Sequence, residues 1–296
     1  MGSTANRELA PAKINLALHV LGRRDDGYHE LDSLVVFAEI GDTISIDMGA
    51  DHAADQAADQ VLSISGRFAS ALTDDDGVNL VAAAARLIGS GTTESALHLD
   101  KQLPVASGLG GGSADAAATL RLLNRIRYPD VSLDRLAALA ETLGADVPMC
   151  LASVPLIARG KGETIRALPT MPSLPLVLVY PGAPVSTPAV FGAFRSPYDA
   201  ALPSIRDGFA TPAALIDWLH GTRNGLEPAA MRVAPIIGEA LSGISAQPGC
   251  RLARMSGSGS TCFGIFDDIE QARSAAQSLA DTHSDWWVRA TRTRPT

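Results

Sequence analysis

The chain has 296 residues, of which 46% are hydrophobic and 19% are charged, a composition that excludes an intrinsically disordered protein. Its formal net charge of -8 disfavours nucleic acid as a partner, because nucleic-acid-binding surfaces are basic. No run of about 18 apolar residues is present, so we expect no membrane partner and a cytoplasmic location. The cysteines Cys150, Cys250 and Cys262 lack the spacing of metal ligands, and we expect them to be reduced structural thiols.

The first predicted strand carries two polar side chains on one face. Residues 13–22, with the sequence KINLALHVLG, alternate between polar and apolar positions, which is typical of a half-buried strand. Lys13 and Asn15 share the polar face about 6.6 Å apart, so both side chains can address one ligand. An Asp26-Gly27 pair predicts a turn after this strand. Further strands are predicted at residues 33–40, 42–48, 60–66 and 96–101, and residues 50–60 are expected to form an exposed loop.

Helical patterns follow in the first half of the chain. Ser113 and Ser132 are the predicted N-caps of two of these helices, because a serine side chain can accept a hydrogen bond from a first-turn N–H. Asp115 is then expected in the first turn of its helix, where the helix dipole favours a negative charge. The predicted helices span residues 79–89, 113–126 and 132–144.

A cluster of prolines at positions 155, 169, 172 and 175 marks a predicted domain boundary. We therefore expect an N-terminal domain of residues 1–165 and a C-terminal domain of residues 166–296. The second half has no regular β-α-β rhythm, which favours an α+β fold. Its predicted elements are strands at 175–180 and 286–291, two strands around a Gly/Ser turn in 251–266, and helices at 212–221, 268–281 and from Pro228 to about Leu241.

Three consecutive glycines, Gly110 to Gly112, stand immediately before one of the predicted helices. Each glycine costs roughly 0.5–1 kcal/mol inside a regular element, so the run requires a physical reason. One reason is a phosphate site, in which bare main-chain N–H groups and the helix N-terminus point at an anion. The other is a tight turn where a helix and a strand pack closely. The run matches neither of the two common phosphate-binding fingerprints, and local sequence leaves both explanations open.

The string from Pro104 to Ala114 resembles the phosphate loop of the GHMP kinases, P-x-x-x-G-L-G-[SG]-[SG]-[SA]. Motifs at residues 10–31, 142–151 and 254–266 are similar to other family motifs in the same order, and the resemblance covers nearly the whole chain. It implies an α+β, two-domain fold with an N-terminal domain like ribosomal protein S5 domain 2 and a C-terminal ferredoxin-like α/β sandwich. The family usually has two serines after the glycines, and this chain has Ser113 and Ala114, so one hydroxyl contact is lost.

Within the family, the combination of A-K-I-N-L with D-G-Y-H resembles the branch that phosphorylates a cytidine diphosphate derivative. The resemblance implies that Lys13 lies beside the reacting hydroxyl and that Asp146 is the general base. Local sequence alone also allows a solvated strand lysine and a turn aspartate at these positions. The implied substrate-binding residues at the cytosine are Tyr28 for stacking, His29 for hydrogen bonding, and Phe191 with Thr187 on the opposite side of the ring. Asn15 is implied in positioning the substrate, and the loop with Gly257 in contacting its methylerythritol and phosphate end.

The resemblance also implies an ATP-binding set that is centred on the glycine loop. Asn79 and Lys101 are the outlying members of this set. The loop itself supplies Pro104, Val105, Ala106, Ser107, Gly108, Leu109, Gly110, Gly111, Gly112, Ser113 and Ala114.

The activity that the resemblance implies is transfer of the γ-phosphate of ATP, with Mg²⁺, to the 2-hydroxyl of 4-(cytidine 5′-diphospho)-2-C-methyl-D-erythritol. This reaction belongs to non-mevalonate isoprenoid precursor biosynthesis, and the expected assembly is a monomer or a weak homodimer. Two alternatives stay open at this point. One is a GHMP kinase for another small alcohol of the homoserine or mevalonate type, and the other is a nucleotide-binding sensor without catalysis.

Overall fold

The computed structural model describes residues 6–47, 62–72, 79–89 and 96–296, and the loop predicted at 50–60 lies outside these ranges. The chain forms two compact units, each assembled from separate stretches of sequence. The first comprises residues 1–12, 41–105 and 110–152, and the second comprises 13–40, 106–109 and 153–296. Strands β1 (Arg7–Arg23) and β2 (His29–Ile46) contribute residues to both units. The domain boundary near residue 165 stays a prediction.

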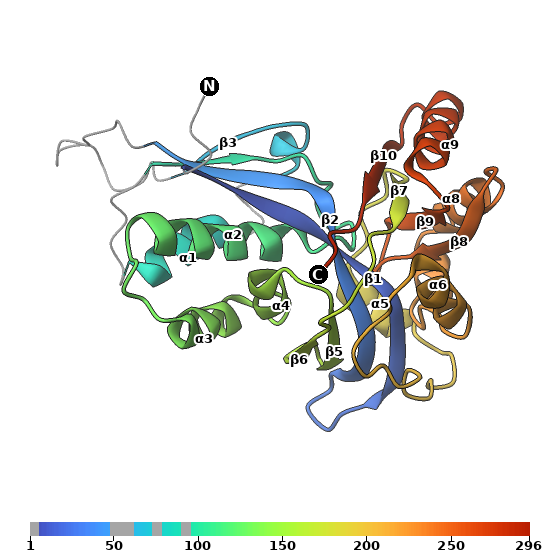
Figure 1. Cartoon of the computed structure of the whole chain (residues 1–296), viewed down its shortest axis with the longest axis horizontal. Coiled ribbons are helices and arrows are strands. Elements are labelled where there is room, and N and C mark those ends of the chain that lie inside the picture. Colours follow the sequence, from blue (N-terminus) through green and yellow to red (C-terminus); the bar gives the residue numbers. More distant parts are fainter. Residues whose placement is uncertain (1–5, 48–61, 73–78, 90–95) are drawn as a thin grey trace. The chain divides into compact units, whose positions relative to one another are not determined.

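In the first unit a small set of paired strands is accompanied by helices. The end of β2 pairs antiparallel with β4 (Leu97–Asp100), and β3 (Leu62–Ser65) pairs parallel with β4. The helices of this unit lie together on one side of these strands, as Figure 1 shows. They are α1 (Leu80–Ile88), α2 (Gly111–Ile126), α3 (Leu133–Leu143) and α4 (Val147–Ala152). A 3-10 turn, η2 (Ala69–Ala71), follows β3.

Of the two helix caps predicted in the first unit, one is confirmed and one is wrong. Ser132 caps α3, as predicted, by accepting a hydrogen bond from Arg135 N–H. Asn79 caps α1 in the same way through Val81 N–H. The prediction that Ser113 caps α2 is wrong, because the helix already begins at Gly111, after Gly110 in a left-handed conformation. Asp115 therefore lies beyond the first turn, and the dipole argument for it was also wrong.

The second unit contains two groups of antiparallel strands. The start of β2 pairs with β5 (Leu156–Gly160), which pairs with β6 (Thr164–Ala167). A four-stranded sheet has the order β10-β7-β9-β8. Its strands are β10 (Trp287–Arg292), β7 (Pro175–Tyr180), β9 (Cys262–Phe266) and β8 (Cys250–Met255).

Helices complete the second unit and bury its core. Helices α8 (Ile236–Ser245) and α9 (Ile269–Thr282) pack against the four-stranded sheet, and Ile244, Leu279, Val177 and Phe266 belong to one buried cluster. The remaining helices are α5 (Thr187–Ala193), α6 (Pro212–His220) and α7 (Glu227–Val233). The three cysteines form no disulfide, as expected.

Several predicted elements changed their extent. The strands predicted at 33–40 and 42–48 are one strand, β2, which continues through Gly41. Residue 41 must be glycine because β1 passes close by, and a Cβ would collide with the carbonyl of Ala10. The helix predicted from Pro228 is divided into α7 and α8, with Pro235 at the break, since proline lacks the N–H that a continuous helix needs. The short elements α4, α5, β5 and β6 were not predicted.

Candidate active site

The centre of the glycine loop is hydrogen-bonded to the strand that carries the candidate catalytic lysine. Lys13 N–H donates to the carbonyl of Leu109 over 2.8 Å. Gly108 has a φ of +80°, and a Cβ there would lie 2.5 Å from the carbonyl oxygen of Ser256. Only glycine tolerates both the left-handed backbone and this close approach. The loop and the lysine strand are therefore joined through main-chain atoms.

Ser256 connects three of the sequence motifs within the second unit. Its hydroxyl accepts a hydrogen bond from Asn15 N–H at 3.2 Å and donates one to the carbonyl of Gly108 at 3.1 Å. Close by, Thr261 N–H donates to the carbonyl of Ser107 at 2.9 Å. The A-K-I-N strand, the centre of the glycine loop and the loop between β8 and β9 thus meet at one serine, which the sequence reasoning did not single out.

The side chain of Asn15 is buried and only partly satisfied. Its Nδ2 donates to Ser33 Oγ at 2.8 Å, and Ser33 Oγ donates to the carbonyl of Ala17 at 2.7 Å. Its Oδ1 has no hydrogen-bond partner, although the residue is only 4% exposed. A buried amide oxygen without a donor is unfavourable, and a ligand hydroxyl would satisfy it. The amide oxygen of Asn15 is thus free to accept a hydrogen bond, and its role in positioning the substrate stays a prediction.

An aromatic cluster brings together His29 and Phe191, two of the residues expected at the cytosine. Their rings stack with centroids 4.7 Å apart. Phe194 meets the His29 ring edge-on at 5.8 Å and stacks on Tyr198 at 5.9 Å. Tyr28 is 59% exposed, and Lys161 Nζ lies 5.0 Å from the centre of its ring. Phe194, Tyr198 and Lys161 were missed by the sequence reasoning, and only the spacing of Phe194 one helical turn after Phe191 could have suggested its place.

His29 is adapted to a neutral role. Burial, with a smaller contribution from the positive charge of Arg23, lowers its pKa below the usual 6.5. A neutral imidazole has one donor and one acceptor nitrogen, and this combination suits the polar edge of a nucleobase. The ring can therefore read a base and stack at the same time.

Thr187, at the start of α5, lies beside the loop that contains Gly257. Its hydroxyl shares a hydrogen bond of 2.8 Å with the hydroxyl of Ser258. Gly257 has a φ of +58°, and a Cβ there would be 3.4 Å from Asn15 Oδ1. The loop that contains Gly257 therefore contacts Thr187 through Ser258 and approaches Asn15 at Gly257, and the role of these residues in substrate binding stays a prediction.

Lys101 lies in a buried cluster of charges in the first unit. Its ammonium contacts Asp42 Oδ2 at 2.5 Å and Asp115 Oδ2 at 2.7 Å, and all three side chains are buried. Burial lowers the pKa of Lys101, but the two carboxylates prevail and raise it. Asp42 escaped the sequence reasoning, since nothing in a strand pattern marks a single aspartate as a buried partner. The expected contact between Lys101 and ATP stays a prediction.

Several further predicted residues belong to the first unit. Asp146 directly precedes α4, where its carbonyl accepts a hydrogen bond from Cys150 N–H at 3.2 Å, and the residue is half-buried. Asn79 is occupied as the cap of α1, with its Oδ1 2.9 Å from Val81 N. Gly111, Gly112 and Ser113 form the first turn of α2, and Ala114 is fully buried behind it. The roles of these residues stay predictions.

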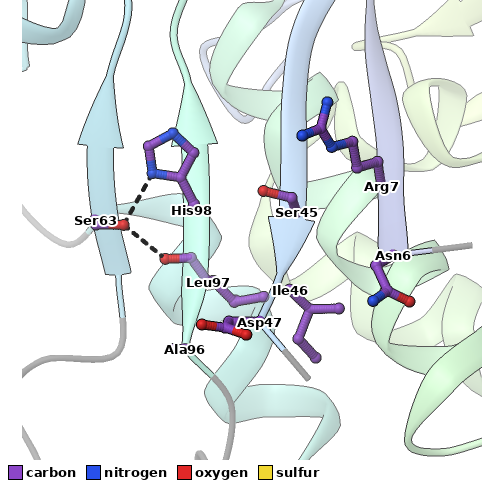
Figure 2. Close-up of a pocket in the computed structure, with 9 residues that line it drawn as sticks. All are labelled: Asn6, Arg7, Ser45, Ile46, Asp47, Ser63, Ala96, Leu97 and His98. Atoms are coloured by element: carbon purple, nitrogen blue, oxygen red, sulfur yellow. Dashed lines mark hydrogen bonds between the residues drawn. The ribbon is translucent and has the colours of Figure 1, made fainter. Parts of the chain in front are cut away.

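An open pocket of about 390 Å³ in the first unit has a different location (Figure 2). It lies at the ends of the strands, where Ser63 Oγ bonds with the ring of His98 at 2.9 Å and donates to the carbonyl of Leu97 at 3.3 Å. None of the predicted site residues lines it. The lining residues are Asn6, Arg7, Ser45, Ile46, Asp47, Ser63, Ala96, Leu97 and His98.

Neither a protein-built metal cage nor a membrane span is found in the part of the chain that the structure describes. No three His, Cys, Asp or Glu side chains gather there in an arrangement that could hold a metal ion. None of the helices described has both the length and the apolar character needed to cross a bilayer.

Comparison with known families agrees with this geometry. Residues 79–153 match the GHMP kinases N terminal domain, and residues 201–285 match the GHMP kinases C terminal domain. Among solved structures, a crystal structure of 4-(cytidine 5′-diphospho)-2C-methyl-D-erythritol kinase is similar with a TM-score of 0.75 and 32% identity, covering 97% of this chain and 98% of the other. A homoserine kinase from Cytophaga hutchinsonii shares the fold alone, with a TM-score of 0.64 and 17% identity. The expected α+β GHMP kinase fold is confirmed.

Curated relatives narrow the family further. A 4-diphosphocytidyl-2-C-methyl-D-erythritol kinase of Chelativorans sp. (strain BNC1) is 45% identical over 97% of this chain and 95% of its own length. The protein of the same name from Agrobacterium fabrum (strain C58 / ATCC 33970) is 47% identical over 99% of this chain and 97% of its own. The chain therefore belongs to the GHMP kinases and, within them, to the 4-diphosphocytidyl-2-C-methyl-D-erythritol kinase family.

Proposed function

We propose that this kinase transfers the γ-phosphate of ATP to the 2-hydroxyl of 4-(cytidine 5′-diphospho)-2-C-methyl-D-erythritol. The names of relatives that share 45% and 47% of its sequence support this substrate. The observation that carries the proposal is the meeting of three motifs at Ser256, next to the unsatisfied Oδ1 of Asn15. A hydroxyl of a polyol acceptor is the kind of donor that this oxygen lacks.

In this proposal the main chain holds the triphosphate. Helix α2 begins without a side-chain cap, so its first N–H groups are not occupied by a serine or aspartate of its own first turn. The helix dipole adds a partial positive charge at the same end. Phosphoryl transfer requires little covalent help, so alignment of the γ-phosphate by these amides accounts for much of the catalysis.

Lys13 and Asp146 take the two chemical roles in the proposed reaction. The ammonium of Lys13 stabilises negative charge on the transferring phosphoryl group, and its strand is fixed to the loop through Leu109. The carboxylate of Asp146 accepts the proton of the acceptor hydroxyl as that oxygen attacks phosphorus. Both assignments follow the family motif.

The aromatic cluster gives the proposed specificity. Tyr28 and Phe191 offer ring faces to the cytosine, and neutral His29 offers a donor and an acceptor to its polar edge. A small acceptor such as homoserine or mevalonate has no base to fill this cluster, so we expect it to be a poor substrate.

Mg²⁺ is expected to accompany ATP. Because the described residues form no cage of three or more ligating side chains, the donor set fits an ion that is held mainly by phosphate oxygens and water, as Mg²⁺ commonly is. When bound, the ion would neutralise part of the triphosphate charge. The cytoplasmic location and the monomeric or weakly dimeric state belong to the same proposal.

A coupled assay of ADP release tests the proposal, with the phosphorylated product identified by mass. Purified protein with ATP is offered the cytidine acceptor, homoserine or mevalonate at equal concentrations. Turnover on the cytidine acceptor at least about a hundredfold above the other two is expected. If the protein prefers another alcohol, that alcohol becomes the assigned substrate. If it binds ATP tightly but releases no ADP with any alcohol, a nucleotide-binding sensor is favoured.

A further inference from the structure

The buried cluster of Lys101, Asp42 and Asp115 fastens the chain on both sides of the glycine loop. Before the loop, Asp42 Oδ1 accepts hydrogen bonds from Gln102 N–H at 2.5 Å and from Leu103 N–H at 2.8 Å. After the loop, Lys101 Nζ bonds to Asp115 in α2. The ammonium also lies directly under the first turn of α2, since a Cβ at Gly111 would be 3.0 Å from Nζ. The entry and the exit of the loop are therefore tied to the same three side chains.

This arrangement is unfavourable unless its charges balance. A lysine under a helix N-terminus opposes the helix dipole, and two carboxylates near a phosphate-binding loop would repel the ligand. Replacing a buried ionic network by apolar residues often leaves a protein equally stable, so stability alone does not explain why three charges are buried here. Pairing the ammonium with the carboxylates cancels both conflicts at the loop.

The protonation of Asp115 helps to balance the charges of the cluster. Burial raises the pKa of Asp115 to about 8; Lys101 opposes the shift and Asp42 reinforces it. Asp115 Oδ1 is buried and receives no hydrogen bond, and the lack of a donor disfavours the ionised carboxylate, in the same direction as the raised pKa. At neutral pH one proton on Asp115 leaves one ammonium and one carboxylate, so the cluster carries no net charge. Above about pH 8 it gains a negative charge beside the loop.

Other charges around the cluster face solvent. The side of α1 that is buried carries only apolar residues, and so does the buried side of α4. Asp100, at the end of β4, bonds to the side chain of Gln102 and is half-buried. The charged residues of α1 and α3 are exposed to solvent. They are Arg86, Asp134, Arg135 and Glu141. Among the residues of the first unit that the structure describes, Lys101, Asp42 and Asp115 are the charged side chains that are buried.

We propose that Lys101, Asp42 and Asp115 are positioning residues that hold both ends of the glycine loop in place and keep its underside electrically neutral for the triphosphate of ATP. The inference rests on the proposed function, because it takes the loop to be the site of the triphosphate. It predicts an effect on ATP binding and no effect on binding of the acceptor.

The decisive variant is Asp115→Asn, which keeps the shape and the acceptor for Lys101 but removes the titration. The KM for ATP and the KM for the cytidine acceptor are measured from pH 6.5 to 9.5. In the unmodified protein the KM for ATP is expected to rise at least about threefold above pH 8, since a new negative charge then faces the phosphates. In Asp115→Asn the KM for ATP stays flat. Asp134→Asn, on the exposed first turn of α3, is the matched control and should follow the unmodified profile.

The triple variant Lys101→Met/Asp42→Asn/Asp115→Asn tests the loop geometry without a buried unpaired charge. If it melts cooperatively within a few degrees of the unmodified protein, its KM for ATP is expected to rise about tenfold while the KM for the acceptor is unchanged. A folded triple variant with normal ATP KM, or an Asp115→Asn profile that matches the unmodified protein, overturns the inference. If the triple variant does not fold, the Asp115→Asn profile decides alone.

The same experiments separate this inference from the proposed function. Affinity for a fluorescent non-hydrolysable ATP analogue is titrated over the same pH range, without any acceptor. If the unmodified protein binds the analogue with the expected pH dependence but phosphorylates none of the alcohols, the proposed function fails and the inference about the Lys101 cluster stands. If it phosphorylates the cytidine acceptor with an ATP affinity that no cluster variant alters, the function stands and the inference fails.

Discussion

The main-chain N–H of Lys13 donates a hydrogen bond of 2.8 Å to the carbonyl of Leu109. The candidate catalytic lysine is therefore itself one of the residues that hold the glycine loop. Any displacement of the loop therefore moves the strand from which the ammonium projects. If the loop binds the phosphate as proposed, this one hydrogen bond links the phosphate-binding main chain to the strand that carries the proposed stabilising charge.

Removing the ammonium or the candidate base should stop the chemistry without unfolding the chain. We expect Lys13→Met to lower kcat by at least about a hundredfold, because one stabilising charge at the transferring group is lost. Asp146→Asn should lower it by about 10²–10⁴-fold, the usual contribution of a general base. Coupled ADP release gives kcat, and thermal melting serves as the control for folding. Turnover near the unmodified value in either variant would take that residue out of the mechanism.

The hydroxyl of Ser256 should matter more than its small size suggests. Ser256→Ala removes the acceptor for Asn15 N–H and the donor for the Gly108 carbonyl, and each hydrogen bond contributes about 1 kcal/mol. We expect the free energy of unfolding to fall by about 1–2 kcal/mol and kcat to fall about tenfold, because Asn15 and the loop lose their common anchor. Urea unfolding and steady-state kinetics measure the two effects. Ser242→Ala, at an exposed position of α8, is the control, and equal behaviour of the two variants would contradict this role.

Gly108 is expected to tolerate no side chain. Alanine there must adopt a φ of +80° and place its Cβ 2.5 Å from the Ser256 carbonyl oxygen. The left-handed backbone alone costs about 1–2 kcal/mol, so the unfolding free energy should drop by at least that amount and the KM for ATP should rise. Gly22→Ala, where a Cβ meets nothing within 4 Å, provides the comparison. The interpretation fails if Gly108→Ala unfolds and binds ATP like Gly22→Ala.

Binding of the acceptor should weaken in acid through His29. Its pKa lies below 6.5, so the ring is neutral at pH 7 and becomes positive only as the pH falls through that lowered value. Protonation removes the acceptor nitrogen, and the KM for the cytidine acceptor should therefore be constant from pH 8 to about 6.5 and rise at lower pH. The KM for ATP, measured in the same series, is the internal reference. A rise that persists unchanged in His29→Asn would assign the titration to another group.

Local patterns predicted the elements whose causes are local. The cap at Ser132 and the end of α3 follow from residues within four positions of one another, and they are as predicted. The start of α2 was predicted at Ser113 because serine is a common N-cap residue. The helix begins earlier, at Gly111, and so includes two of the three glycines. Strand β2 was predicted as two strands because a glycine commonly interrupts a strand. Gly41 instead lies inside the strand, where the nearby main chain of β1 leaves no room for a side chain.

Only those residues of the candidate site that belong to a recognisable sequence motif could be predicted. Lys13, the loop and the Gly257 segment could be recognised as motifs, but the residues that connect them could not. Ser256 and Asn15 are separated by 241 positions, and Lys101 and Asp42 by 59, distances over which no periodicity in a single sequence reports contact. Phe194 and Tyr198 also contact the aromatic cluster around His29 without belonging to any recognised motif.

The interleaving of the two units along the chain limits how this enzyme can be divided. Residues 13–40 and 106–109 belong to the second unit although residues on either side belong to the first. A polypeptide that starts at residue 153 would lack strand residues that pair with β5 and the serine-bonded segment at Asn15. Any single breakpoint between residues 13 and 152 would therefore divide the segments of at least one compact unit between two polypeptides, and fragments expressed separately would have to reassemble that unit from both.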